Sequence, residues 1–152
     1  MSPALPDAGA LEPLIGSWTV EAEFPTAGPL VVRGRTTFDW LLARRFVLQR
    51  TEMDHPDAPD SSSILAPDPD RPGGWRQHYF DARGVVRLYD MSFDGRTWTL
   101  TRRAADFSPL DFAQRFTAEL EDGGDTLAGR WEIAPEGEDW RLDFRLTCRR
   151  AG

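Results

Sequence analysis

The sequence predicts an all-β protein, folded as a single antiparallel up-and-down β-barrel of about ten strands with a short N-terminal helical turn. Three observations support this prediction. Short runs alternate apolar and polar side chains, as in Trp18–Phe24, which is typical of strands with one buried face. Turns that contain glycine, such as Asp94-Gly95, separate these runs at hairpin spacing. A meander of this many strands tends to close on itself.

The elements can be assigned in order along the chain. With 152 residues and 40% hydrophobic side chains, we expect one domain over residues 1–152, of which 1–10 form a flexible tail. A helical turn is expected over residues 7–15, capped by Asp7 and ended by Gly16. The strands are expected at residues 18–24, 30–39, 45–53, 63–66, 74–80, 85–92, 98–103, 112–120, 126–133 and 140–148.

Residues 54–74 are the least regular part of the sequence. They are rich in proline and aspartate and surround one brief run, Ser63–Ala66. We therefore expect mostly loop here. Such a loop is either a solvated connection or a lid over the barrel mouth, and the solvated interpretation is favoured because most long loops are of that kind.

The composition excludes several classes of function. The net charge is −7, from 25 acidic and 18 basic residues, all of the latter arginine, which argues against nucleic acid as a partner. No lysine is present, which excludes Schiff-base chemistry and a P-loop. One cysteine and two histidines cannot make a Cys/His zinc cluster, so no metal is expected. No apolar run is long enough for a membrane helix, so we expect a cytoplasmic protein without a membrane partner.

The hairpin over residues 74–92 holds the strongest candidate site. If Asp81–Gly84 forms a four-residue loop, Phe80 pairs with Val85 and His78 pairs with Arg87. One face then carries Arg76, His78, Phe80, Val85, Arg87, Tyr89 and Met91. This mixture of apolar walls with a few polar groups is typical of a pocket that orients a small ligand.

The opposite orientation of this hairpin stays open, with that face in solvent and Tyr79, Val86 and Leu88 in the core. We favour the orientation in which His78, Arg87 and Tyr89 point inward. An arginine buried in this way needs a carboxylate or a ligand anion as its partner. The charge of Arg87 would also lower the pKa of His78 and leave a neutral imidazole that can accept a proton.

Other strands supply further candidates for the inner wall. Clean alternations predict shared faces for residues 112–120, 126–133 and 140–148, with Arg115 and Glu119 pointing out and Arg102 at the rim. Most inward side chains are expected to fill the core, although a barrel of this size can hold one small ligand. The predicted ligand-binding residues are His78, Arg87, Tyr89, Phe80, Met91, Trp40, Gln49, Gln114, Phe116 and Trp131.

Several segments together resemble a known family. Leu14-Ile15-Gly16-Ser17-Trp18, the segment Gln77–Ser92 and Gly129-Arg130-Trp131 are similar to small bacterial lipocalin-like proteins of unknown function, common in actinobacteria. The resemblance covers roughly residues 11–150. It implies a calycin-type barrel, similar in layout to nitrobindin-like and fatty-acid-binding-protein-like barrels, with Trp18 plugging the closed end. Nitrobindin-like relatives imply haem held by a histidine of a late strand, but residues 112–148 contain no histidine, so no cofactor is expected.

The function expected from these observations is the binding of a small, largely hydrophobic molecule in the barrel interior. One alternative is a lipocalin-like cyclase or isomerase that uses His78 or Tyr89 for proton transfer. Another is a barrel with a solid core that acts as an interaction or dimerisation module, so a homodimer is among the expected partners. A covalent mechanism is not expected, because Cys148 reads as a small buried hydrophobe and no Gly-x-Ser-x-Gly motif is present.

Overall fold

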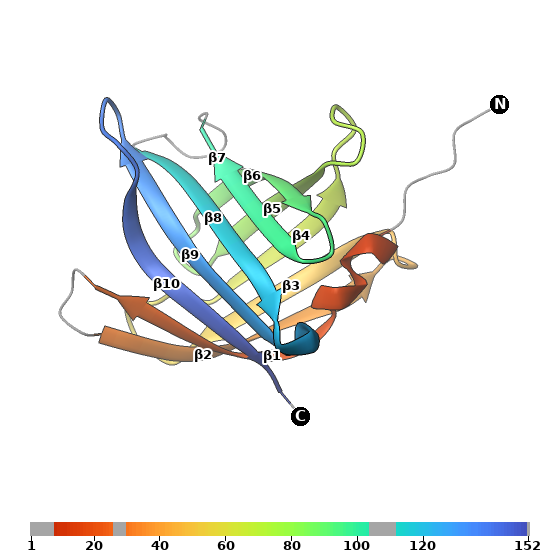
Figure 1. Cartoon of the computed structure of the whole chain (residues 1–152), viewed down its shortest axis with the longest axis horizontal. Coiled ribbons are helices and arrows are strands. Elements are labelled where there is room, and N and C mark those ends of the chain that lie inside the picture. Colours follow the sequence, from red (N-terminus) through yellow and green to blue (C-terminus); the bar gives the residue numbers. More distant parts are fainter. Residues whose placement is uncertain (1–7, 26–29, 104–111, 152) are drawn as a thin grey trace.

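A computed structural model describes residues 8–25, 30–103 and 112–151 of the chain. It contains ten antiparallel strands in one closed barrel, in which each strand pairs with the next and β1 pairs with β10 (Figure 1). The strands are β1 (Gly16–Phe24), β2 (Leu30–Leu41), β3 (Phe46–Met53), β4 (Ser61–Pro67), β5 (Trp75–Asp81), β6 (Val86–Phe93), β7 (Thr97–Arg102), β8 (Phe112–Glu121), β9 (Thr126–Pro135) and β10 (Arg141–Arg150). The predicted fold class is therefore confirmed.

The alternation seen in the sequence sets the two faces of the sheet. In β2, for example, Val32, Gly34, Thr36 and Phe38 are buried while the residues between them remain more exposed. The inner positions of all ten strands converge on one core. In the described part of the chain every strand has a paired neighbour on each side, and closure of this kind limits edge-to-edge association.

The turns of an up-and-down barrel alternate between its two ends. The β2–β3, β4–β5, β6–β7 and β8–β9 turns lie at the same end as the 3-10 helix η1 (Gly9–Leu14), which we call the plugged end (Figure 1). The β3–β4, β5–β6 and β9–β10 turns lie at the other end, which we call the distal end. Strand β4 therefore divides the irregular stretch 54–74 into two turns at opposite ends of the barrel.

The helix η1 confirms the expected N-terminal helical turn and seals the plugged end. Leu11 and Leu14 of η1 are fully buried, and the indole Nε1 of Trp18 donates a hydrogen bond to Leu14 O at 3.0 Å. The expected tail over 1–10 overlaps this plug. Ala8 is itself fully buried and its N–H donates to Arg44 O, whereas residues 1–7, with the predicted cap Asp7, lie outside the described residues.

Arg150, near the end of β10, holds the plug to the barrel. Its guanidinium donates hydrogen bonds to the backbone oxygens of Ile15, Pro13 and Gly124 at 2.8–3.1 Å, and it lies 4.1 Å from the centre of the Trp18 ring. A Cβ atom on Gly16 would come within 2.9 Å of this guanidinium, and Gly16 has a φ of +128°. Both facts explain why glycine stands two residues before Trp18.

Candidate ligand-binding site inside the barrel

The β5–β6 hairpin sets the inner wall, and its register differs from the prediction by one residue. Phe80 pairs with Val86 instead of Val85, because the turn has five residues instead of four. Asp81 N donates to Val85 O, and Gly84 in the turn has a φ of +85°. A shift of one residue between strands moves one strand's side chains to the opposite face relative to its partner. The predicted shared face is therefore wrong.

The two strands accordingly contribute a different set of inner residues. Arg87, Tyr89 and Met91 of β6 face inward, as the favoured orientation predicted. Their partners on β5 are Tyr79, Gln77 and Trp75, in that order. Tyr89, Met91, Gln77 and Trp75 are all buried.

His78 and Phe80, predicted to be inward, lie on the outer face. His78 pairs with Ile64 and Leu88, and the ring of Phe80 is 45% exposed. The pKa of His78 is lowered by partial burial and then by the charge of Arg76, whereas the prediction attributed the effect to Arg87. His55 lies in the β3–β4 turn at the distal end, so neither histidine of the chain reaches the barrel interior.

The remaining predicted wall residues have different surroundings. Met91 and Phe116 belong to the apolar core, and Trp131 packs against both Phe116 and Tyr89. Gln114, two residues before Phe116 on β8, meets Tyr89 through a hydrogen bond. Gln49 donates through Nε2 to Thr36 Oγ1 at 3.2 Å. Trp40 is only partly buried and lies under the guanidinium of Arg44, 4.2 Å from the ring centre.

The inner face has a continuous group of polar side chains between the apolar core and the distal end. We call this group the polar belt; its members are Thr36, Gln49, Thr51, Ser63, Gln77, Arg87, Tyr89, Arg102 and Gln114. Thr36, Ser63, Gln77, Arg102 and Gln114 are among its buried members. Buried polar side chains are costly unless they find partners, so their contacts decide what the belt can do.

Part of the polar belt is satisfied internally. The hydroxyl of Tyr89 donates to Gln114 Oε1 at 3.1 Å, and the hydroxyls of Thr36 and Thr51 are 2.8 Å apart. Two atoms are not satisfied. Within the described part of the chain, Gln77 Oε1 and Arg87 Nε are buried and have no hydrogen-bond partner. The belt therefore presents an unused acceptor and an unused donor on neighbouring strands.

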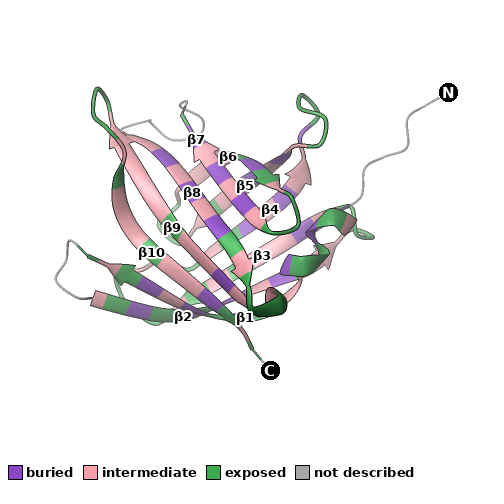
Figure 2. Ribbon diagram, in the orientation of Figure 1, coloured by how far each residue is buried: buried purple, intermediate pink, exposed green. Residues whose placement is uncertain are grey.

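Aromatic and aliphatic side chains continue the inner face beyond the polar belt. The ring of Trp131 lies 5.5 Å from Tyr89 and 6.4 Å from Phe144, and Phe144 stacks on Phe24 at 4.7 Å. Trp131, Phe144 and Leu146 lie at inward positions of the strand register but are only half-buried. Much of β9 and β10 has the colour of intermediate burial (Figure 2). These inward side chains therefore keep part of their surface accessible to solvent.

The hydroxyl of Tyr79 is engaged by the turn that follows it, which makes Tyr79 a poor candidate for proton transfer. Its hydroxyl donates to Asp81 Oδ2 at 2.8 Å, and Arg83 Nη2 donates to the same oxygen at 2.7 Å. Burial, followed by this hydrogen bond, raises the pKa of Tyr79. Burial also pushes the pKa of Asp81 upward, but the hydrogen bonds from Arg83 and Tyr79 outweigh it and bring that pKa to about 2.

Two further expectations on the late strands are settled by the structure. The predicted common face of residues 140–148 is wrong at its start, because a register shift between Leu142 and Phe144 breaks the alternation. Trp140 instead stacks against Arg115, an arginine that pairs with Glu132. Cys148 is buried as expected, and burial raises its pKa to about 12, which makes the thiol a poor nucleophile.

Sequence reasoning missed three members of this inner wall. Gln77 and Tyr79 were assigned to the wrong face by the register, and Arg102, predicted at the rim, is 3% exposed. The signal for Gln77 and Tyr79 was their alternation with Trp75, a residue too large and apolar to be left outside. No signal in the sequence marks Arg102 as buried.

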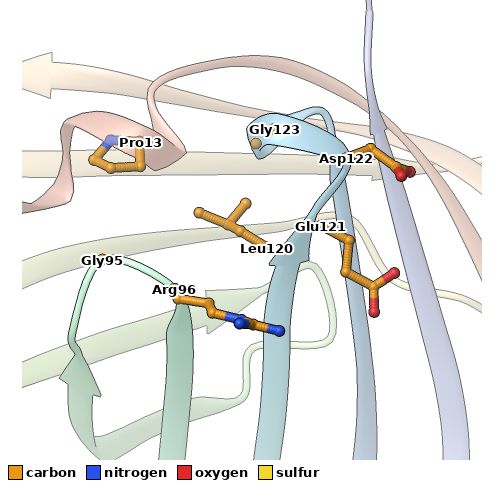
Figure 3. Close-up of a pocket in the computed structure, with 8 residues that line it drawn as sticks. Pro13, Gly95, Arg96, Leu120, Glu121, Asp122 and Gly123 are labelled. Atoms are coloured by element: carbon orange, nitrogen blue, oxygen red, sulfur yellow. The ribbon is translucent and has the colours of Figure 1, made fainter.

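Two hollows on the described surface lie outside the barrel interior. The larger, of about 580 Å³, lies at the plugged end around Leu120, between Pro13 of η1, the Gly95-Arg96 turn and the turn at Gly123 (Figure 3). The smaller, of about 360 Å³, lies at the distal end beside His55 and Arg83. Neither is lined by any of the predicted ligand-binding residues.

Other kinds of site find less support in the described residues. They contain no group of three or more His, Cys, Asp or Glu side chains placed to hold a metal ion. No helix within the described ranges has the length and apolar character needed to cross a membrane.

The geometry defines a closed ten-stranded antiparallel barrel with a plugged end and a polar inner belt, and a solved structure shares this class of fold. The structure reported as the "Crystal Structure of Rv2717c from M. tuberculosis" superimposes with a TM-score of 0.66 and 17% sequence identity, over 97% of this chain and 100% of that chain. At this identity the likeness shows the fold alone. No protein-family model matches the sequence. No curated protein matches it either.

Proposed function

We propose that this protein binds a small, largely hydrophobic molecule in the distal half of the barrel interior. The observation that carries this proposal is the coexistence of buried, unpartnered polar atoms with half-buried inward aromatic rings. Gln77 Oε1 and Arg87 Nε would orient the molecule, while Trp131 and Phe144 would pack against its apolar part. Ligand pockets have this character, with mostly apolar walls and a few well-placed polar groups.

The proposal includes the lipocalin-like relationship and cytoplasmic location expected from the sequence. It favours binding over the cyclase or isomerase alternative. That alternative relied on His78 or Tyr89, but His78 is on the outer face and Tyr89 already donates its hydroxyl to Gln114. The plugged half alone matches the solid-core alternative, since Trp98 packs edge-on against both Phe38 and Phe116 there.

A fluorescence titration with a neutral probe, N-phenyl-1-naphthylamine, tests this function. We expect saturable binding of one probe per chain, with energy transfer from the interior tryptophans, which include Trp131. Leu146→Trp places a larger side chain on the half-buried inner face and should weaken binding by at least about tenfold. Arg145→Trp adds the same ring at the exposed neighbouring position and should leave binding unchanged.

Circular dichroism and thermal unfolding establish that both variants fold. If Leu146→Trp does not, Phe144→Trp serves as a second, smaller enlargement of the same wall. Probe binding that is absent from the wild type, or that survives both inner substitutions in folded protein, contradicts the proposal.

A second candidate function, self-association, is favoured by one observation on the outer face. Ile64, His78, Phe80, Val86 and Leu88 lie together there by strand pairing and form an apolar surface we call the outer patch. Arg76 and Asp90 lie opposite each other in the strand register beside it, and a two-fold contact with a second copy could match their opposite charges. Light scattering after size exclusion should then show a dimer that Phe80→Glu dissociates; a monomeric wild type rules this candidate out.

A further inference from the structure

We propose that the ligand of the barrel interior is an amphiphilic organic anion, whose single anionic group binds the guanidinium of Arg87. This inference rests on the proposed binding function and specifies the chemical class of its ligand. It follows from the position of Arg87, from what surrounds it, and from the cost of leaving its charge uncompensated.

Arg87 is on the inner face of β6, opposite Tyr79 and two residues before the buried Tyr89. Its Nε is buried without a hydrogen-bond acceptor, and within the described part of the chain no carboxylate forms an ion pair with its guanidinium. Other arginines of the barrel differ in this respect. Arg71 and Arg76 share Asp68, and Arg115 pairs with Glu132.

The inner-face carboxylate at the end of β5 cannot serve as the missing partner. Asp81 is held by Tyr79 at 2.8 Å and by Arg83 at 2.7 Å, on the turn side of the hairpin. The guanidinium of Arg87 therefore keeps its positive charge at this level of the interior, although the net charge of the chain is −7.

The two unpartnered atoms of the polar belt differ in the kind of partner that would satisfy them. A water molecule can donate to Gln77 Oε1 and satisfy it fully. Water can also accept from Arg87 Nε, but it leaves the positive charge without a counter-ion in a partly desolvated site. An anionic oxygen satisfies both the donor and the charge, and planar guanidinium groups bind such oxygens well.

The surroundings determine the rest of the ligand. Trp131 and Phe144 extend toward the distal end, where Phe144 stacks on Phe24, and together with Leu146 they offer apolar contact area that is only partly buried. Toward the plugged end, the packed rings of Phe116 and Trp98 leave the ligand no comparable surface. The anionic group would therefore lie deep, at Arg87, and the apolar body would point toward the distal end.

A matched pair of probes separates this inference from the proposed function itself. N-phenyl-1-naphthylamine is neutral, and 8-anilino-1-naphthalenesulfonate has the same aromatic skeleton with one added sulfonate. We expect the wild type to bind the anionic probe about tenfold more tightly or better, the range expected for a hydrogen bond to a charged group. Arg87→Gln should abolish that preference and change the affinity for the neutral probe by less than about twofold.

Two control variants address binding of the sulfonate to surface arginines. Arg50→Gln removes an exposed arginine of the outer face and should leave the preference intact. Leu146→Trp, which obstructs the interior, should weaken both probes together. A second pair of competitors, dodecanoate and dodecanol, tests whether a carboxylate has the same advantage in displacing the neutral probe.

Each outcome bears on one of the two claims. If neither probe binds, the proposed function fails. If the neutral probe binds inside but the anionic probe gains nothing, or gains an advantage that Arg87→Gln retains, the binding function stands and the anion inference is overturned. Binding of the anionic probe that is as tight in Leu146→Trp as in the wild type also overturns it, because the sulfonate is then held at the surface.

Discussion

The hydroxyl of Tyr89 donates a hydrogen bond to Oε1 of Gln114, 3.1 Å away, and so links β6 to β8 across the inner face of β7. Both residues are buried. This bond fixes the orientation of the Tyr89 ring, against which Trp131 packs edge-on. The polar belt is thereby held rigid at this point, whereas Gln77 and Arg87 beside it keep unused hydrogen-bonding atoms.

Removal of the Tyr89 hydroxyl tests this link. Tyr89→Phe leaves Gln114 Oε1 buried without its donor and should lower the free energy of unfolding by about 1–2 kcal/mol in urea denaturation. The double variant Tyr89→Phe with Gln114→Leu removes both partners and should recover part of that loss. A single variant as stable as the wild type would show that the hydrogen bond does not form in solution.

Substitution of Arg87, unlike that of Tyr89, should stabilise the ligand-free protein. Because its Nε is buried and unpaired in the absence of ligand, Arg87→Met should raise the free energy of unfolding of the ligand-free protein by about 1 kcal/mol. The same variant should lose the preference for anionic probes. Destabilisation of similar size in ligand-free protein would mean that Arg87 has a structural partner, and that its role is not ligand binding.

Arg150 should stabilise the plug. Arg150→Met loses hydrogen bonds to three backbone oxygens and the contact with the Trp18 ring, and should cost about 2–3 kcal/mol of unfolding free energy. Hydrogen exchange should rise first in η1. Arg149→Met, which breaks an exposed ion pair with Glu21, provides the control and should change stability by less than about 0.5 kcal/mol. Equal effects of the two substitutions would contradict the assigned role.

Asp81 gives the stability of the β5–β6 turn a defined pH dependence. Its pKa is about 2 in the folded protein, against 3.8 for an unperturbed aspartate side chain. The ionised carboxylate therefore stabilises the folded state above about pH 4. That contribution is lost as the pH falls through the folded pKa. The stability gap between wild type and Asp81→Asn should therefore be constant from about pH 8 to 5 and shrink between about pH 4 and 2. A gap that does not narrow in acid would show that Asp81 does not form its ion pair.

Strand positions could be predicted because local patterns encode them. Alternating side chains mark each strand, and residues such as Gly84 and Gly95 have positive φ angles that their turns require. The inward faces of Trp98, Phe116 and Trp131 followed from the same alternation and are confirmed by burial or by strand pairing.

The composition of the site could not be predicted to the same degree, because it depends on register. One extra residue in the turn after Asp81 moved His78 to the outer face and brought Gln77 to the inner one. The irregularity near Asp143 similarly placed Trp140 against Arg115. Both events depend on hydrogen bonds within a turn or a bulge, and the alternation of side chains does not report them.

The most direct test of the central claim is the location of a bound neutral probe by intermolecular NOEs to protein methyl groups. The barrel offers methyl groups on both faces of its sheet. Those of Leu146 and Ala22 lie on the inner face, and those of Ile64 and Leu88 lie on the outer face. Binding in the interior predicts NOEs from N-phenyl-1-naphthylamine to Leu146, with none to Ile64 or Leu88. NOEs confined to Ile64 and Leu88 would place the probe on the outer patch and contradict a ligand site inside the barrel.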